Sequence, residues 1–324
     1  MSSSKNKKPH SKLHARIQLK TLIAIALMLG AILAGLLLLS HDPGDKSPGS
    51  ESDEESSSTS PQQMLYHESL DEGKGSRYPE PHSTDKSTKS EDILPLLPPA
   101  SELDGSHIAI IMDDLGANLE AAKRVAKLEI PVTMAIIPDL HHAQESMHIA
   151  AQYGREVMVH LPMEPLNYPR HNPGDMALML EMTEDEIKSR TAYYLRKLPL
   201  AKGCNNHMGS AFTQSPQQMA TVLEQISTQS FYFIDSLTSS NSIGAEQARK
   251  HHVPNATRDI FLDNERDVEK ITNQLIKLLR IAQKNGTSIG ICHPYPETIT
   301  ALEACASLAD EYGVTIVPAS RLVR

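Results

Sequence analysis

Short apolar runs alternate with amphipathic stretches over the last two thirds of the chain. Strand-like apolar runs occur at 108–112, 132–137, 157–161, 231–234, 288–292 and 314–317. Between them, apolar residues recur with helical spacing, most clearly after Asn118 and over 267–285. Strands that alternate with helices in this way predict an α/β fold around a mostly parallel sheet. About seven or eight such units favour a closed or partly closed barrel over an open sheet.

Several expected helices carry recognisable end signals. Thr183 and Glu186 have the spacing of a capping box at a helix start. Ser215 and Gln218 have the same spacing, with a proline at the first helical position between them. Near the end of the chain, the pattern predicts a single helix over 297–312. These signals place the helices between the predicted strands.

The first forty residues have the pattern of a membrane anchor. Residues 1–20 form a basic segment with a formal charge of +6, and residues 22–39 are an uncharged apolar run of 18 residues. About 20 apolar residues cross a bilayer as a helix, and the basic flank marks the cytoplasmic side. We therefore expect a signal anchor over 21–40 that places the rest of the chain in the periplasm of a bacterium. A cleavable signal peptide is the alternative, although no clear A-x-A site follows the run.

Composition divides the remainder into two parts. Residues 41–104 hold 15 acidic and 5 basic residues among many Ser and Pro, which predicts a disordered linker rather than a small domain. Residues 105–324 carry a formal charge of −5 and are long enough for a sizeable core. The mild acidity offers no case for nucleic-acid binding, and no nucleotide-binding motif is present. Three cysteines, an odd number, imply no disulfide framework.

Polar residues that could catalyse a reaction or bind a metal follow several predicted strands. In a βα barrel the active site lies at the carboxyl ends of the strands. The residues at such positions are Asp113, Asp114, His160, Glu164, His207, Asp235 and His293. Each has an ordinary structural explanation alone, such as a helix cap or a turn, but their shared position favours one site. Imidazoles with a carboxylate suit Zn²⁺ with open positions, and a second carboxylate can take a proton from water. This set is typical of a metal-assisted hydrolase acting on an acyl bond.

Six stretches carry a family resemblance. They are IAIIMDDLG, VMVHLPMEP, GCNNHMGSAFT, FIDSLTSSNS, ATRDIFLDN and GICHPYPET, in this order along residues 105–324. Together they resemble the divergent (YibQ-like) polysaccharide deacetylases, a branch of the NodB-homology carbohydrate esterases. The resemblance implies a distorted (β/α)7-type barrel and a metal-dependent removal of N-acetyl groups from a polysaccharide or an amino sugar.

The resemblance also implies roles for individual residues. Asp113 is the expected base and Asp114 a ligand of Zn²⁺ or another divalent transition metal. His160 is the expected second ligand, and His293 the expected general acid. Asn206, Asp235 and Arg258 are expected near the substrate, Arg258 as the residue that orients Asp113.

One position departs from the family pattern. Ordinary members have two histidines four residues apart in the second motif, whereas this chain has His160 and Glu164. The third ligand is therefore either Glu164 or a residue from elsewhere, for which His207 is our choice. If Glu164 does not bind the metal, we expect it to contact the substrate.

Two other functions compete with a deacetylase. A non-catalytic envelope protein could use the same barrel to bind a glycan or a protein. A glycoside hydrolase could use Asp113 and Asp235, but its carboxyl groups must lie about 5–9.5 Å apart across a sugar site. It would leave the strand-end histidines unexplained. The absence of Trp and the presence of only 4 Phe also argue against tight binding of a long polysaccharide.

Overall fold

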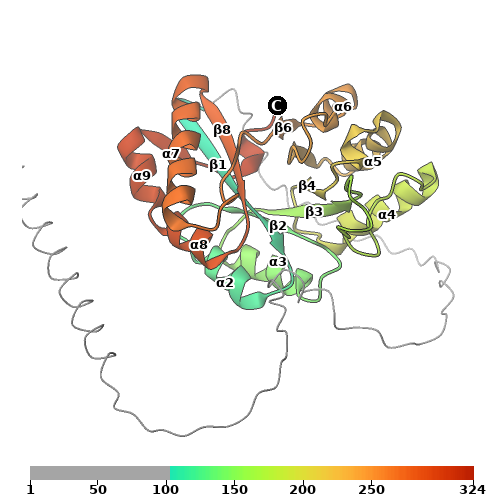
Figure 1. Cartoon of the computed structure of the whole chain (residues 1–324), viewed down its shortest axis with the longest axis horizontal. Helices are drawn as coiled ribbons and strands as arrows, with labels where there is room; N and C mark the ends of the chain where they lie inside the picture. Colours follow the sequence, from blue (N-terminus) through green and yellow to red (C-terminus); the bar gives the residue numbers. More distant parts are fainter. Residues whose placement is uncertain (1–102) are drawn as a thin grey trace, which may run out of the picture. The chain divides into compact units, whose positions relative to one another are not determined.

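The computed structural model describes residues 103–324, which contain one α/β unit built around a parallel sheet (Figure 1). The strands are β1 (Ser106–Leu115), β2 (Thr133–Ile136), β3 (Val157–Met163), β4 (Gly203–Met208), β5 (Tyr232–Asp235), β6 (Asn255–Thr257), β7 (Ile260–Phe261), β8 (Thr287–Cys292) and β9 (Val314–Ile316). The helices are α2 (Leu119–Ala126), α3 (Ala143–Gln152), α4 (Glu184–Lys197), α5 (Pro216–Thr228), α6 (Gly244–Lys250), α7 (Val268–Asn285), α8 (Pro296–Glu303) and α9 (Cys305–Tyr312). The predicted α/β class with a parallel sheet is confirmed.

The sheet curves into a partial barrel. Its strand order is β6-β5-β4-β3-β2-β1-β8-β7, and β9 pairs with the start of β1. The two edge strands, β6 and β7, are joined by only Arg258 and Asp259. The amide of Arg258 donates to Asp235 O on β5, and the amide of Asp259 donates to Ile289 O on β8. The hydrogen-bonded ladder is thus open between β6 and β7, and two consecutive residues connect its edges.

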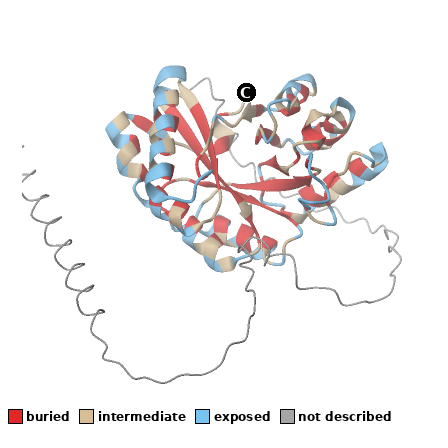
Figure 2. Cartoon of the chain, viewed as in Figure 1, coloured by how far each residue is buried: buried red, intermediate tan, exposed pale blue. Residues whose placement is uncertain are grey.

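Two hydrophobic cores follow from the alternation of side chains along the strands. The larger core lies between the sheet and the helices and contains residues such as Ile108, Ile110 and Met112. The smaller core fills the inside of the curved sheet and includes Ala109 and Ile111. Figure 2 shows the same arrangement, with buried strands inside and helices whose outer faces are exposed. Neighbouring residues of a strand therefore face different environments.

The amino-terminal end of the partial barrel is closed by a polar network. The carboxylate of Glu156 accepts hydrogen bonds from the Tyr232 hydroxyl at 2.8 Å and from the Ser320 amide at 3.0 Å. Burial, with the Glu156 carboxylate beside it, raises the pKa of Tyr232 well above its usual value. Gly203 leaves room for the Tyr232 ring, because a Cβ there would lie 2.5 Å from the ring atom Cδ2. The Glu156 carboxylate and the Tyr232 hydroxyl thus bind each other and Ser320 at this end of the sheet.

Most local predictions are confirmed. The side chain of Asn118 caps α2, and Thr183 and Glu186 form the expected capping box of α4. Helix α5 begins at Pro216 as predicted, but its Ser215 side chain makes no capping bond to the backbone. The helix expected over 297–312 is instead two helices, α8 and α9, that meet at Ala304.

The remaining predictions concern the cysteines and the first part of the chain. The three cysteines are buried and free, in agreement with the absence of a disulfide framework. The basic segment 1–20, the signal anchor 21–40 and nearly all of the linker 41–104 lie outside the described residues. Among the helices of residues 103–324, none has the length and hydropathy required to span a membrane.

Candidate active site

Strand alternation directs a set of polar side chains to the carboxyl end of the barrel interior. Asp113 follows the interior residue Ile111 by two positions on β1, and His160 follows Met158 by two positions on β3. His160 pairs in register with Asn205 of the neighbouring β4. Residues two apart on a strand share a face. The interior core is thus continued towards the barrel mouth by a layer of ionisable and amide groups.

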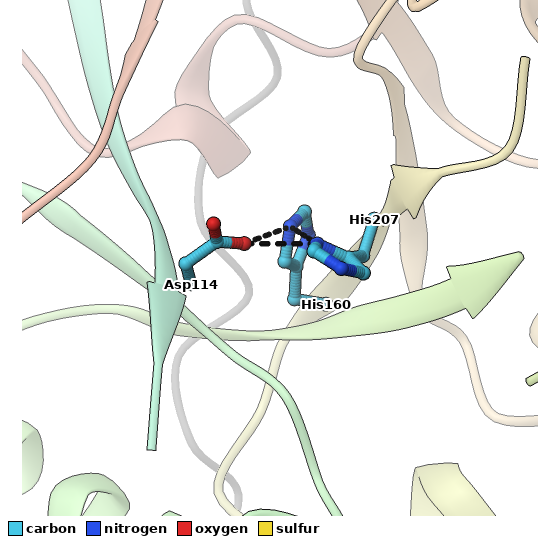
Figure 3. A group of neighbouring side chains, drawn as sticks. All are labelled: Asp114, His160 and His207. Carbon is cyan, nitrogen blue, oxygen red and sulfur yellow. Dashed lines mark hydrogen bonds and ion pairs between the residues drawn. The ribbon is translucent and has the colours of Figure 1, made fainter. Parts of the chain in front are cut away.

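Asp114 joins this layer through an unusual backbone conformation. In a regular strand its side chain would face away from that of Asp113. However, Asp114 has a φ of 57°, a left-handed conformation in which Asp is tolerated better than most residues. Its Oδ1 lies 2.9 Å from His207 Nδ1 and 3.2 Å from His160 Nε2. Figure 3 shows the carboxylate directed at both imidazoles, which come from β3 and β4.

The three groups have the spacing of a metal site. Asp114, His160 and His207 each offer one ligand atom, and all three atoms lie within 4.8 Å of one another. His160 Nε2 and His207 Nδ1 are 3.2 Å apart. Two ligands of a tetrahedral zinc ion are separated by about 3.3 Å when each bond is about 2.0–2.1 Å long. The buried Asp114 Oδ1 has no hydrogen-bond partner despite its close neighbours, so the donor set fits a divalent cation.

The pKa values of the two aspartates are shifted in opposite directions. Burial acts to raise the pKa of Asp114, but the neighbouring imidazoles of His207 and His160 lower it well below the usual value. For Asp113, burial is the dominant influence, and it raises the pKa despite the opposing effects of His160 and His293. Asp114 is therefore anionic at neutral pH, whereas Asp113 is the more basic carboxylate of the pair.

Asn205 lies between the His160 imidazole and the Asp113 carboxylate. Its Oδ1 is 2.8 Å from His160 Nδ1, and its Nδ2 donates to Asp113 Oδ1 at 2.8 Å and to Ser236 Oγ at 3.1 Å. The other carboxylate oxygen, Asp113 Oδ2, lies 3.6 Å from His160 Nε2. Asn205 is fully buried, so water does not compete for these bonds.

His293 approaches the site from the opposite side, directly after β8. Its Nε2 lies 3.7 Å from Asp114 Oδ2. Asp263 holds the ring: one oxygen is 3.1 Å from His293 Nδ1, and the other accepts the His293 amide at 2.6 Å and the Thr298 hydroxyl at 2.8 Å. Burial acts to lower the pKa of His293, but the Asp263 bond and the nearby carboxylates raise it to about 9. The imidazole is therefore protonated at neutral pH and directs Nε2 at the site.

Glu164 does not reach the ligand triangle. Its carboxylate accepts a hydrogen bond from the Leu180 amide at 2.6 Å and so holds the loop between β3 and α4. The group that offers a metal ligand atom beside Asp114 and His160 is His207. Of the two predicted candidates for the third ligand, the geometry thus favours His207.

Asn206 and Asp235 were expected near the substrate, but both side chains lie outside the barrel interior. Asn206 accepts from the Ser236 amide at 2.9 Å and donates to Met208 O at 2.8 Å, so it holds two loops together. Asp235 accepts from the Ser242 hydroxyl at 2.8 Å and stabilises the start of α6. Odd and even positions of a strand face opposite sides, so these two side chains bind the surrounding loops, and their contact with a substrate stays a prediction.

Arg258 has a structural role in the loop after β5. Its guanidinium donates to Ser236 O at 2.7 Å and to Leu237 O at 2.8 Å, which fixes the loop after β5. Among the ion pairs within residues 103–324, none joins Arg258 to Asp113. The side chain that donates a hydrogen bond to Asp113 is that of Asn205. The orientation of Asp113 by Arg258 stays a prediction, since the Arg258 charge still interacts with that of Asp113.

Asn205 and Asp263 were missed as site residues. Asn205 was detectable, because it lies two residues before His207 and therefore shares its face if 203–208 is a strand. Asp263 follows β7, which has only two residues and produces no recognisable pattern.

Comparisons with known proteins agree with the motif resemblance. Residues 110–323 match the family of divergent polysaccharide deacetylases. The chain is 32% identical to the uncharacterized protein YibQ of Escherichia coli K12 over 229 residues, which are 70% of each chain. It is 31% identical over 199 residues to an uncharacterized protein of Haemophilus influenzae, covering 61% of this chain and 70% of that protein.

A solved structure shares the fold as well. The crystal structure of the uncharacterized protein ATU2773 from Agrobacterium tumefaciens superposes with a TM-score of 0.65 at 27% sequence identity. The match covers 68% of this chain and 91% of the other. The match over residues 110–323 and the identity with the relatives show that the chain belongs to the family of divergent polysaccharide deacetylases.

Proposed function

We propose that the protein is a metal-dependent deacetylase that hydrolyses the N-acetyl group of an amino sugar or an N-acetylated polysaccharide. The observation that carries this proposal is the triangle of Asp114, His160 and His207, flanked by a carboxylate on one side and a protonated imidazole on the other. Hydrolysis of an amide needs these parts: a site for the carbonyl oxygen, a base for water, and an acid for the departing nitrogen.

The residues around the triangle divide the proton transfers between them. A divalent ion held by Asp114, His160 and His207 would polarise the acetyl carbonyl and make a bound water more acidic. Asp113 accepts a proton from the attacking water through Oδ2, the oxygen that Asn205 leaves free. His293 then gives its Nε2 proton to the amine nitrogen as the C–N bond breaks, and Asp263 stabilises its charged form. The products are acetate and a free amine.

Zinc is the ion that we propose. Two imidazole nitrogens and one carboxylate oxygen form a common catalytic zinc set that leaves a position open for water or substrate. Other divalent transition metals accept the same ligands, so the metal must be identified by elemental analysis of the purified protein.

The test uses the full chain, assayed for zinc content and for acetate release from N-acetylglucosamine oligomers and peptidoglycan. We expect about one zinc per chain and zinc-dependent acetate release. Asp113→Asn should retain zinc but lose about 10²–10⁴-fold in rate, the contribution typical of a general base. His148→Ala, an exposed histidine of α3, is the matched control and should behave as wild type. Zinc binding without acetate release from any such substrate would refute the deacetylase and favour the glycan- or protein-binding alternative.

The cellular location is proposed from the sequence of residues 1–40 alone. We propose a single-pass anchor in the bacterial inner membrane with the barrel in the periplasm, where envelope glycans are accessible. Fractionation of cells, combined with protease protection of the barrel, tests this location. Recovery of the full chain in the cytoplasmic fraction would refute it.

A further inference from the structure

We infer that Asn205 is a positioning residue that orients a metal ligand and the base together through one side-chain amide. It would determine which nitrogen of His160 faces the ligand triangle and which oxygen of Asp113 is free to take a proton. This inference rests on the proposed function, and it assigns a role to a residue that the family resemblance did not point to.

The orientation of the amide follows from its neighbours. The Nδ2 group faces Asp113 Oδ1 at 2.8 Å and Ser236 Oγ at 3.1 Å. A carboxylate only accepts hydrogen bonds, so the end of the amide beside Asp113 must be the NH₂ group. The carbonyl end, Oδ1, must then face His160.

This orientation fixes the tautomer of His160. An amide oxygen has no hydrogen to donate, so the His160 Nδ1 atom, 2.8 Å away, must carry a hydrogen. In the neutral ring, the lone pair is then left on Nε2, the atom 3.2 Å from Asp114 Oδ1. Partners of this kind on the far nitrogen raise the basicity of a ligating histidine and hold its ring.

The same amide selects the reactive oxygen of Asp113. Its Oδ1 is occupied by the Asn205 NH₂ group, whereas its Oδ2 lies 3.6 Å from His160 Nε2, beside the ligand triangle. If the Asp113 carboxylate rotated so that its two oxygens exchanged places, the Asn205 NH₂ group would bind the oxygen that then faced it. One oxygen would still be bound and the other free. Asn205 therefore leaves one proton-accepting oxygen and keeps it close to the expected position of the water.

The neighbouring Asn206 provides a matched control. Both asparagines lie on β4 and are buried, with exposures of 0% for Asn205 and 1% for Asn206. The side chain of Asn206 binds the loops at Met208 and Ser236 and touches neither histidine nor carboxylate of the site. A general cost of removing a buried asparagine from this strand will appear in both positions, but a cost specific to the site will appear only at Asn205.

The experiment measures zinc affinity, by competition with a chelator, and acetate release at saturating zinc in the full chain. Asn205→Ala should lower zinc affinity about 10–100-fold, as expected for loss of a partner behind a ligating histidine. It should also lower the rate at saturating zinc by at least about tenfold. Asn205→Asp retains an acceptor for His160 but presents a carboxylate to Asp113. It should keep zinc affinity within about threefold of wild type while the rate at saturating zinc falls by at least about tenfold.

Several outcomes would overturn the inference. Asn205→Ala that matches Asn206→Ala in zinc affinity and in rate would show that Asn205 is only structural. Equal losses of zinc affinity in Asn205→Ala and Asn205→Asp would refute the tautomer argument, and the Asp variant keeps the test valid if the Ala variant does not fold. A wild type that binds no zinc would overturn the proposed function together with the inference, whereas an active wild type with an unaffected Asn205→Ala would overturn the inference alone.

Discussion

Removal of His207 gives the most direct test of the metal site. His207 supplies the one ligand atom from β4, and its loss leaves only Asp114 Oδ1 and His160 Nε2, 3.2 Å apart. The metal-free fold should tolerate His207→Ala, because the variant also removes a buried Nε2 atom that has no hydrogen-bond partner. An unpaired buried polar group costs about 1–3 kcal/mol, which offsets much of the cost of truncation.

The expected size of the effect follows from linkage. At a zinc concentration 100 times Kd, binding stabilises the wild type by about 2.7 kcal/mol. In a domain of this size, that corresponds to a rise in Tm of about 5–10 °C. Loss of a residue that hydrogen-bonds to a metal ligand can weaken metal binding by about 100-fold. Loss of the ligand itself should weaken zinc binding by at least this factor. At the same zinc concentration, the variant should then gain no more than about 0.4 kcal/mol, or about 1–2 °C.

The assay is thermal unfolding of the full chain with and without zinc, with His148→Ala as the control. His148 is an exposed histidine on α3, so its removal should leave the zinc-dependent shift unchanged. A His207→Ala protein stabilised by zinc as strongly as the wild type would refute the assignment of His207 as a ligand.

Three further predictions test the neighbouring groups. Because Asp263 helps to raise the folded-state pKa of His293 from 6.5 to about 9, the stabilisation it provides is complete below pH 6.5 and is lost as pH rises through 9. In urea unfolding, the free energy of unfolding of the metal-free wild type should fall by about 3 kcal/mol over this pH range, and that of Asp263→Asn should fall by less. An equal pH dependence in the two proteins would contradict this prediction. Asp114→Asn should lose the zinc-dependent Tm shift and should also unfold more easily than the metal-free wild type, because the amide cannot replace the carboxylate charge that His207 and His160 stabilise; a retained shift would exclude Asp114 as a ligand. Gly203→Ala should cost about 2–3 kcal/mol in urea unfolding, because its Cβ would lie 2.5 Å from the Tyr232 ring; wild-type stability would show that the ring moves freely.

The architecture was predictable because periodicity carries much of the information about an α/β fold. Apolar runs located the strands that are buried on both faces, such as 288–292, and capping residues located helix starts. Strand β4 escaped detection because its sequence, GCNNHM, is polar, although all but the last residue is buried. Its polar side chains belong to the site and to the loops around it. They replace the apolar pattern by which a buried strand is recognised in a sequence.

The site was predictable only in part, for physical reasons. The motif resemblance predicts that Asp114, His160 and His207 lie together as metal ligands, and the spacing of their side chains agrees with that expectation. The outward orientation of Asn206 and Asp235 could not be predicted, because the register of inward and outward side chains cannot be assigned to a strand that is not recognised or is very short. Asp263 depends on a two-residue strand that becomes visible only in three dimensions.

Three non-glycine residues with left-handed backbone lie around the barrel mouth. They are Asp114 at the end of β1, Met208 at the end of β4 and Leu237 after β5, with φ values of 57°, 51° and 48°. For most residues other than Gly this conformation costs about 1–2 kcal/mol, and Asp tolerates it better than Met or Leu. Glycine substitutions at these positions would relieve the backbone strain and so favour thermostability. They would also make the turns that orient the site residues more flexible. The rim is the part of this fold where thermostability and activity should be hardest to improve together.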